Sequence, residues 1–206
     1  MAFYGRIRTY LQIDERDDYR ACEKLNLFIQ DDLEEELFSL IRDRDVAIVG
    51  AGPSLRKVKD LKEEIIVAAD GASRYLESYV RTPDIIVTDL DGITKINGSS
   101  FYVVHAHGDN IPSIDMVIEM KKMIGTCQGF QLGRTKMYGG FTDGDRAALL
   151  ALIAKARKVS LYGMDFDNEK IGMYSKPYLL DDIPLSERKK IKLKIAKEIL
   201  EFSGVI

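Results

Sequence analysis

The sequence predicts an α/β protein with a Rossmann-like, open and mostly parallel sheet, flanking helices and an N-terminal helical extension. Short apolar runs of strand length alternate with helical patterns, which is typical of a parallel sheet with right-handed crossovers. Most of these runs end in a polar residue or a glycine, namely Gly50, Asp70, Asp89, His105 and Asp165. Because open α/β sheets bind ligands outside the carboxyl ends of their strands, we expect a site there.

We expect three segments: an N-terminal helical segment over 1–44, an α/β catalytic core over 45–170, and a C-terminal loop and helix over 171–206 that packs on the core. In the first segment, apolar residues at three- and four-residue steps predict a helix from Asp17 to about Arg42, with a break near Asp31 as an alternative. Residues 1–16 could pair as a strand or pack as an arm. The apolar face of the helix could serve a homodimer or an ordinary core contact.

Apolar runs in the core predict strands over 46–49, 65–69, 84–88, 101–104, 128–132 and 159–162. Helices are predicted after Gly52, through Tyr75 and Leu76, over 111–124 and over 146–156. A Lys-rich amphipathic helix over 186–202 follows, with Ser186 as its N-cap.

The composition describes an ordinary globular protein of 206 residues, 46% hydrophobic and 31% charged. A net charge of −3 provides no general basic field for nucleic acid, and no apolar run approaches the ~20 residues that cross a membrane. The first residues lack the pattern of a signal peptide, so we expect a cytoplasmic protein. Cys22 and Cys127 have no Cys or His at metal-ligand spacing, and we expect free, buried thiols in a reducing cytoplasm.

An acidic turn follows the strand over 84–88, with Asp89 and Asp91 two positions apart. If the backbone stays extended that far, both carboxylates point to the same side of the chain. Two hard oxygen ligands at the carboxyl end of a parallel strand suit Mg²⁺, with water and phosphate oxygens filling its other positions. An Asp-rich turn without a metal is the alternative, because Asp and Gly are common turn formers.

A glycine-rich turn, Gly50-Ala51-Gly52, follows the first strand, where the missing Cβ atoms would let the backbone approach a phosphate. Leu55 replaces the third glycine of the dinucleotide fingerprint. Asp70 ends the second strand, where an NAD-binding protein holds its ribose hydroxyls. The pattern favours phosphate or nucleotide binding over a merely structural turn, without securing NAD.

The two histidines of the chain, His105 and His107, share one turn with Asp109 and Asn110. Alternation puts the two rings on the same side if the strand persists. No Cys or third His lies nearby to complete a zinc site, so contact with a phosphate is the better interpretation. Capping of the following helix applies more naturally to Asp109 and Asn110.

A second glycine-bearing stretch enters the helix over 146–156. Thr142 could cap this helix and Asp143 would favour its macrodipole, while Arg146 or the preceding glycines, Gly140 among them, could contact substrate. Arg134 and Lys136 are further candidates for phosphate contacts. The pair Asp165 and Asp167 repeats the Asp-x-Asp spacing but could equally be loop.

These motifs, in this order, resemble the archaeal 6-hydroxymethyl-7,8-dihydropterin diphosphokinases, the MptE-like family. The resemblance covers about 45–167 and rests on four stretches: Gly50 to Leu55, Ala69 to Ala72, Pro83 to Gly92, and His105 to Asn110. The chain is also distantly similar to thiamine diphosphokinase. The Lys-Asp-x-Thr-Asp of the thiamine enzymes is not reproduced around Asp109, which favours a pterin as acceptor.

The resemblance implies transfer of a diphosphoryl group from ATP to the hydroxymethyl group of a reduced pterin, with release of AMP, in folate- or tetrahydromethanopterin-type biosynthesis. It implies Mg²⁺ on Asp89 and Asp91, with Asp70 and Asp109 as further ligands or as groups that orient the acceptor hydroxyl. The substrate- and nucleotide-binding residues expected are Gly50, Gly52, Ser54, Gly71, His105, His107, Asn110, Gly140, Thr142 and Arg146.

Two functions of other classes remain open. Asp89 to Thr94 also resembles the nucleophile motif of haloacid-dehalogenase-type phosphatases, but that motif normally follows the first strand of the core, and two strands precede it here. A non-catalytic nucleotide- or NAD-binding module would use the glycine-rich turn with Asp70. It would leave Asp89, Asp91 and Asp109 without a role.

Overall fold

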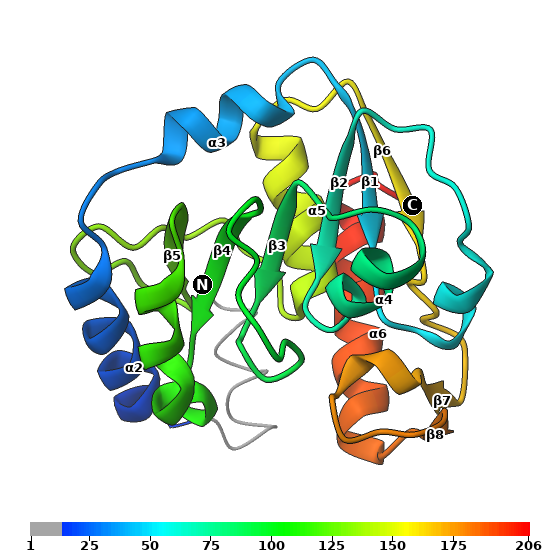
Figure 1. The fold of residues 1–206 in the computed structure, drawn as a ribbon. Coiled ribbons are helices and arrows are strands. Elements are labelled where there is room, and N and C mark those ends of the chain that lie inside the picture. The colour runs from blue at the N-terminus through cyan, green and yellow to red at the C-terminus, as the bar shows by residue number, and fades with distance from the viewer. Residues whose placement is uncertain (1–13) are drawn as a thin grey trace.

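The computed structural model describes residues 14–206 and confirms the α/β class, with six parallel strands in the order β5-β4-β3-β2-β1-β6 (Figure 1). The strands are β1 (Asp45–Val49), β2 (Ile65–Ala69), β3 (Ile85–Thr88), β4 (Phe101–Ala106), β5 (Met123–Cys127) and β6 (Lys158–Tyr162). The chain builds outward from β1 to β5 and then returns to place β6 on the other side of β1. The direction therefore reverses between β1 and β6, which is where such sheets form a crevice. Most of the segment 1–16, for which a strand and a packed arm were both open, lies outside the described residues.

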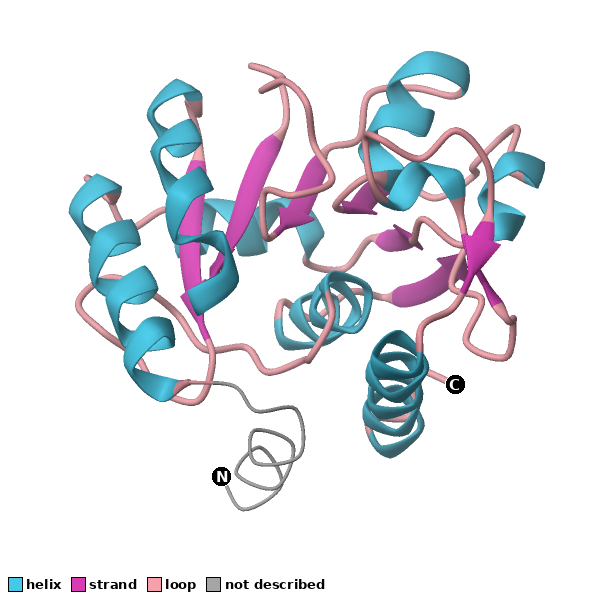
Figure 2. Cartoon of the chain, turned by 90° about the horizontal axis from the view of Figure 1, so that it is seen from below, coloured by secondary structure: helices cyan, strands magenta, loops and turns pink. Residues whose placement is uncertain are grey.

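Helices cover both faces of the sheet (Figure 2). Alternate residues of the central strands point to opposite faces: Ala47 and Val49 join one buried cluster, and Val46 and Ile48 join the other. The first cluster is covered by α2 (Glu15–Phe28), η1 (Pro53–Lys57), α4 (Ala72–Tyr79) and η2 (Gly108–Glu119). The second is covered by α3 (Glu34–Ile41), α5 (Asp143–Ile153) and α6 (Glu187–Phe202).

The helical pattern over 17–42 forms two helices rather than one, in agreement with the alternative of a break near Asp31. Leu25 of α2 belongs to the first apolar cluster, whereas Leu37 and Ile41 of α3 belong to the second. The polar residues between the two helices stay exposed while the chain passes from one face of the sheet to the other.

The prediction for β5 is wrong. The sequence predicted a helix over 111–124 and a strand over 128–132, but the helical segment is a 3₁₀ helix that ends at Glu119, and the strand is Met123–Cys127. Pro112 disfavours an α-helix there. Glycine is uncommon inside strands, so Gly125 weakens the strand signal in the sequence. A Cβ at this position would lie 2.8 Å from Ile29 Cδ1, so glycine lets α2 pack closely on β5.

The two cysteines are buried as predicted, but the prediction of free thiols is wrong. Cys22 of α2 and Cys127 of β5 form a disulfide with their Cα atoms 5.9 Å apart. The pairing joins residues 105 positions apart, so it follows from the docking of α2 on β5 rather than from any local spacing. Among residues 14–206, no helix combines the length and apolar character that a membrane crossing requires.

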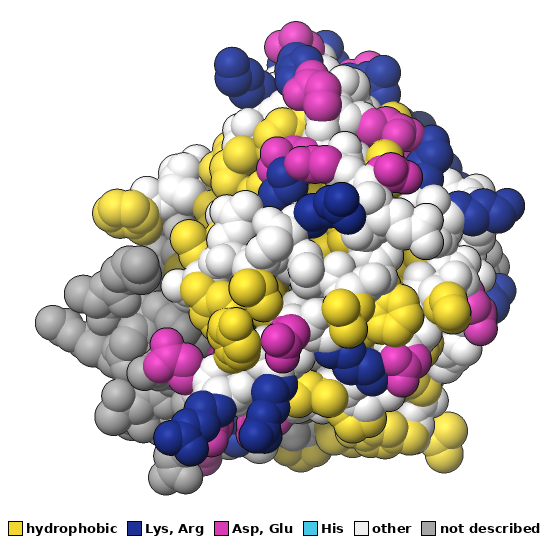
Figure 3. Space-filling model, turned by 90° about the vertical axis from the view of Figure 1, so that its left-hand side faces the viewer, with side chains coloured by type: hydrophobic (Ala, Val, Ile, Leu, Met, Phe, Trp, Pro, Cys, Tyr) yellow, Lys and Arg dark blue, Asp and Glu magenta, His cyan; other side chains and the backbone are white. Residues whose placement is uncertain are grey.

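The C-terminal segment runs past the carboxyl ends of the strands (Figure 1). It contains a short antiparallel ribbon, β7 (Lys170–Ile171) with β8 (Ile183–Pro184), and the 3₁₀ turn η3 (Met173–Ser175). The helix α6 follows, and Ser186 caps it as predicted by accepting a hydrogen bond from Lys189 N. On the left-hand side of the molecule, acidic and basic side chains are interspersed and no single basic area covers that face (Figure 3).

Asp145 fixes the start of α5. Its buried carboxylate accepts hydrogen bonds from Phe141 N at 2.6 Å and from Thr142 N at 2.7 Å, while Thr142 is the N-cap. We predict that Asp145→Ala lowers the free energy of unfolding by about 2–4 kcal/mol, because two half-buried amides lose a charged acceptor that is itself buried. Denaturant unfolding would measure this. Asp167→Ala, which removes a carboxylate whose side chain is 82% exposed, should cost less than about 1 kcal/mol. Equal losses would contradict the assignment.

Candidate active site

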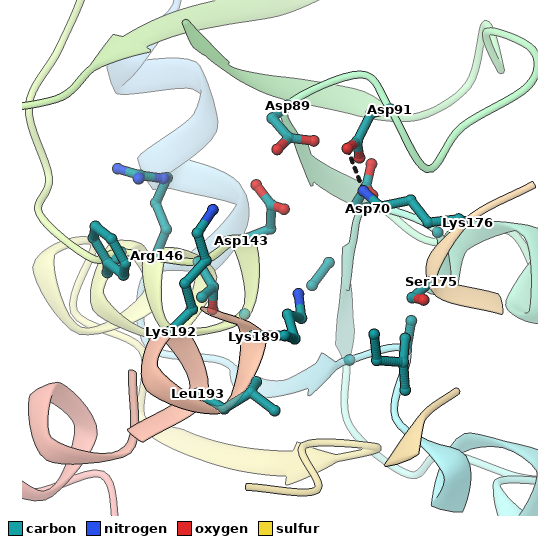
Figure 4. A pocket seen from close by; sticks show the side chains of 18 of the residues that line it. Asp70, Asp89, Asp91, Asp143, Arg146, Ser175, Lys176, Lys189, Lys192 and Leu193 are labelled. Atoms are coloured by element: carbon teal, nitrogen blue, oxygen red, sulfur yellow. Dashed lines mark ion pairs between the residues drawn. The ribbon is translucent and has the colours of Figure 1, made fainter. Parts of the chain in front are cut away.

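A cavity of about 540 Å³ lies at the carboxyl ends of the strands, beside the reversal between β1 and β6 (Figure 4). This is a volume typical of small-molecule sites. Acidic residues line it on the side of β2 and β3, and cationic residues line it on the side of η3 and α6.

Three carboxylates gather at the ends of the neighbouring strands β2 and β3. One oxygen from each of Asp70, Asp89 and Asp91 lies within 4.8 Å of the others, and we call this group the carboxylate triad. Thr88 Oγ1 donates to Asp70 Oδ1 at 2.7 Å, and Gly92 N donates to the same oxygen at 3.1 Å. These two bonds hold the acidic turn after β3 against the end of β2.

The turn brings Asp89 and Asp91 together without the extended backbone on which the prediction was conditional. Leu90 between them has φ 77°, a left-handed conformation that is uncommon for a residue with a Cβ. Its side chain is buried and its N–H donates to Thr88 Oγ1 at 2.7 Å, which holds the conformation in place. A Cβ at Gly92 would collide with the Asp70 carboxylate, so only glycine fits there.

The carboxylates differ in how easily they ionise. Burial, followed by the charges of Asp89 and Asp91, raises the pKa of Asp70 to about 7, and burial also raises the pKa of Asp91. Burial, the largest single effect on Asp89, acts in the same direction, but hydrogen bonding to His107, whose Nε2 lies at 3.2 Å, and to Asp91, with the charges of His107 and Lys176, together hold the pKa of Asp89 below its usual range. The buried Asp89 Oδ1 makes no hydrogen bond within residues 14–206.

Asp143 is a fourth carboxylate in the cavity, and sequence reasoning assigned it only to the macrodipole of α5. Thr142 and Asp145 form the cap, which leaves the Asp143 side chain to point toward the triad (Figure 4). Burial and the charges of Asp89 and Asp70 raise its pKa. An acidic residue at the start of a helix is ordinary, so its sequence carried no distinguishing signal.

The two histidine rings lie on the same side of the chain, with ring centroids 5.8 Å apart. The strand β4 continues to Ala106, so it includes His105, which is buried and shares a hydrogen bond with Thr126 Oγ1 at 3.2 Å. Burial lowers the pKa of His105, which keeps this ring neutral. His107 contacts Asp89 instead of standing free for a phosphate, and its Nδ1 accepts from Asp109 N at 3.3 Å.

Asp109 and Asn110 lie apart from the triad. Asp109 lines the cavity at its rim with 80% of its side chain exposed. Asn110 is buried outside the cavity lining and donates from Nδ2 to Asp89 O at 2.8 Å and to His105 O at 2.6 Å. Asn110 thus ties the end of β3 to the end of β4, and it holds the backbone of Asp89 in place.

The glycine-rich turn lines the cavity, but the amides of Gly50 and Gly52 already donate within the protein. Gly50 N donates to Tyr162 O at 2.8 Å, Gly52 N to Gly163 O at 2.9 Å, and Ser54 N to Asp165 Oδ2 at 2.7 Å. Ser54 itself does not line the cavity. A Cβ at Gly50 or Gly52 would meet Gly163 O at 2.7 Å. The glycines therefore serve the close approach of the turns after β1 and β6.

Of the other predicted binding residues, Gly71, Thr142 and Arg146 line the cavity and Gly140 does not. Arg146 is buried, and its guanidinium donates to Gly139 O and to Gln128 Oε1, each at 2.9 Å. The guanidinium therefore positions Gln128 on the cavity wall. Gly140 has φ 85°, and a Cβ on it would lie 2.6 Å from Arg146 Cα. It is a packing glycine at the entrance to α5.

Sequence reasoning missed the cationic side of the cavity. Arg188, Lys189 and Lys192 of α6 line it, together with Lys176, whose ammonium forms an ion pair with Asp91 (Figure 4). We call the first three the α6 cations. Their positions fall on one side of the helix start, but in sequence they are three among the six basic residues of an amphipathic helix. Arg134 and Lys136, the predicted phosphate contacts, lie outside the cavity lining, and Lys136 pairs with Asp32 and Glu34.

Comparison with known proteins agrees with the motifs. The sequence model of the 6-hydroxymethylpterin diphosphokinase MptE-like family matches residues 20–170. Relatives named 6-hydroxymethyl-7,8-dihydropterin pyrophosphokinase include those of Pyrococcus furiosus (42% identical over 97% of this chain and 90% of that protein), Methanocaldococcus jannaschii (37%, over 97% and 92%) and Methanothermobacter thermautotrophicus (34%, over 98% and 92%).

Among solved structures, the MAf glycosyltransferase of Magnetospirillum magneticum AMB-1 aligns with 68% of this chain and 29% of its own length, at 18% identity and a TM-score of 0.43, too distant to bear on function. The family model covers most of the chain, and the relatives align with nearly its full length, so together they establish its family. The chain belongs to the 6-hydroxymethylpterin diphosphokinase MptE-like family.

Proposed function

We propose that this chain is a Mg²⁺-dependent 6-hydroxymethyl-7,8-dihydropterin diphosphokinase that uses ATP as donor and releases AMP. The names of its archaeal relatives support the reaction. The observation that carries the proposal is the cavity itself, in which a carboxylate triad and a set of cations line different sides of one space. Enzymes that transfer phosphoryl groups use both kinds of group. Carboxylates hold a metal ion that neutralises the developing charge, and cationic side chains bind the phosphates.

The residues present fit a divalent cation. Three carboxylate oxygens lie within 4.8 Å of one another, and the buried Asp89 Oδ1 lacks a hydrogen-bond donor among the described residues. Oxygen ligands of this kind suit Mg²⁺, which keeps several water or phosphate ligands. Asp70, Asp89 and Asp91 would hold the ion. When bound, Mg²⁺ would neutralise charge on the phosphates and hold the reactants in line.

The reaction forms a bond from the hydroxymethyl oxygen of the acceptor to the β-phosphorus and breaks the bond from that phosphorus to the bridging oxygen of AMP. The hydroxyl proton must leave as the bond forms. We assign Asp143 as its acceptor, because its carboxylate points into the cavity beside the triad and has a raised pKa. Asp109 at the rim stays a candidate for contact with the pterin.

The other functions receive less support. A phosphatase with Asp89 as nucleophile normally carries this motif after the first strand of its core, whereas β1 and β2 precede the acidic turn here. A dinucleotide-binding module would need the amides of the glycine-rich turn, which already donate within the protein. A cytoplasmic location and a tetrahydromethanopterin-type pathway stay part of the proposal.

Turnover is the direct test of the proposed reaction. Purified protein with ATP, MgCl₂ and 6-hydroxymethyl-7,8-dihydropterin should produce AMP and the pterin diphosphate, as followed by nucleotide separation. Asp89→Asn should lower kcat/KM by about a hundredfold or more, since a catalytic metal supplies several kcal/mol. Asp143→Asn should lower kcat while Mn²⁺ binding persists. Asp109→Asn, at an exposed rim position, should lose less than about tenfold.

Several outcomes of this assay would contradict the proposal. AMP formed with thiamine but not with the pterin would preserve the chemistry and change the acceptor. Release of phosphate, or a trapped phospho-aspartate at Asp89, would favour the phosphatase. Normal turnover of Asp89→Asn would remove the metal assignment, and normal turnover of Asp143→Asn would remove its role as proton acceptor.

The raised pKa of Asp70 predicts a pH-dependent stability. A carboxyl whose pKa is raised by folding holds its proton more tightly when folded, so it destabilises the metal-free protein progressively as pH rises from the unfolded value of 3.8 to about 7. Asp70→Asn keeps an acceptor for Thr88 and Gly92 and removes this charge. The free energy of unfolding of Asp70→Asn, relative to that of wild type, should therefore increase from pH 3.8 to about pH 7 and then level off.

The gain is limited to about 4 kcal/mol, since each pKa unit corresponds to about 1.4 kcal/mol. Denaturant unfolding in chelator at several pH values would measure it. Saturating Mg²⁺ should shrink or reverse the difference, because the ion stabilises only the wild-type triad. A stability difference that stays constant with pH would contradict the electrostatic account of Asp70.

A further inference from the structure

The α6 cations have no described function, although they line the cavity. Within residues 14–206, the side-chain nitrogens of Arg188, Lys189 and Lys192 form no hydrogen bond or ion pair; Lys192 Nζ lies 6.0 Å from the centroid of the Phe141 ring. By contrast, Lys190 and Lys197 on the same helix pair with Glu187 and Asp167. Lys194 is also unpaired among the described residues, but it is exposed outside the cavity lining, so Arg188, Lys189 and Lys192 are the unpaired cations of α6 that line the cavity.

Their position is unfavourable unless an anion is bound. Arg188 and Lys189 lie in the first turn of α6, where the macrodipole already places positive charge and where acidic residues are preferred. Lys192 is one turn further on, and burial together with the charges of Lys189 and Arg188 lowers its pKa. Three like charges at the positive end of a helix repel one another, and a multiply charged anion would remove that repulsion.

The glycine-rich turn is a poorer phosphate site. Gly50 N, Gly52 N and Ser54 N donate to Tyr162 O, Gly163 O and Asp165 Oδ2, and the Asp165 carboxylate lies so close to Gly52 that it would collide with a Cβ there. A carboxylate at this point would repel a bound phosphate. Across the cavity, Ser175 Oγ is buried and has no hydrogen-bond partner among residues 14–206. The free donors of the cavity therefore lie on the side of η3 and α6.

We propose that Arg188, Lys189 and Lys192 bind the polyphosphate chain of the donor, with Ser175 as an additional hydrogen-bond donor. This assignment deepens the proposed function and rests on it for the identity of the donor as a nucleoside triphosphate. The chain of phosphates then lies between the α6 cations and the carboxylate triad. Lys176 keeps its separate role as the counter-ion of Asp91.

The test is calorimetric binding of inorganic tripolyphosphate and of ATP, each with MgCl₂. Lys189→Ala and Lys192→Ala should each weaken both ligands by about tenfold to a hundredfold, the usual effect of removing a hydrogen bond between charged groups. Lys192→Arg should recover part of the affinity. Lys194→Ala and Lys190→Ala on the same helix, which lie outside the cavity lining, should bind as wild type does. Circular dichroism and thermal unfolding would confirm that each variant is folded.

The outcomes separate this proposal from the proposed reaction. If wild type binds tripolyphosphate, the two cavity variants lose that affinity, and no acceptor yields AMP, the polyphosphate site stands and the reaction fails. If wild type makes AMP and pterin diphosphate while both variants keep the wild-type affinity for tripolyphosphate and the wild-type KM for ATP, the reaction stands and the polyphosphate site is wrong. Equal losses in Lys194→Ala, or no binding of tripolyphosphate by wild type, would also overturn the site.

Discussion

The mutual repulsion of Asp70, Asp89 and Asp91 is the constraint on which the rest of the site depends. The parallel pairing of β2 with β3 places the ends of these strands side by side, and the bonds from Thr88 and Gly92 to Asp70 fix the acidic turn against β2. The protein thereby holds one oxygen from each of three carboxylates within 4.8 Å of the others, with Asp70 buried, Asp89 half-buried and Asp91 exposed. Such an arrangement is stable only with cations nearby. Lys176 is one of these cations, and the cavity has room for a metal ion as well.

This site accumulates features that work against stability. Asp70 and Leu90 adopt left-handed backbone conformations, Asp89 keeps an unsatisfied oxygen, and the α6 cations gather at the positive end of a helix. Each is unfavourable in isolation, and together they mark the place where function rather than folding selected the residues. Elsewhere the two apolar clusters on either side of the sheet follow ordinary rules of alternation and packing.

Local patterns predicted the parts of this molecule that depend on local signals. The strand over 65–69, the acidic turn and the capped helix at Ser186 need only short apolar runs or cap residues, and Asp70, Asp89 and Asp91 follow from their positions at strand ends. The errors arise where tertiary packing decides. Gly125 makes β5 look unlike a strand because α2 needs the space, and the disulfide joins distant segments. Asp143 and the α6 cations reach the cavity only through the docking of α5 and α6, which the sequence does not display.

The central claim is that the triad holds a divalent cation facing the phosphates. Anomalous diffraction from crystals grown with MnCl₂ and ATP would test it most directly, because manganese scatters anomalously and accepts the same oxygen ligands as magnesium. We expect the strongest anomalous peak within coordination distance of oxygens from Asp70, Asp89 and Asp91, on the side of the cavity that faces α6. A bound nucleotide with no peak at the triad, or with its manganese held elsewhere in the cavity, would contradict the account.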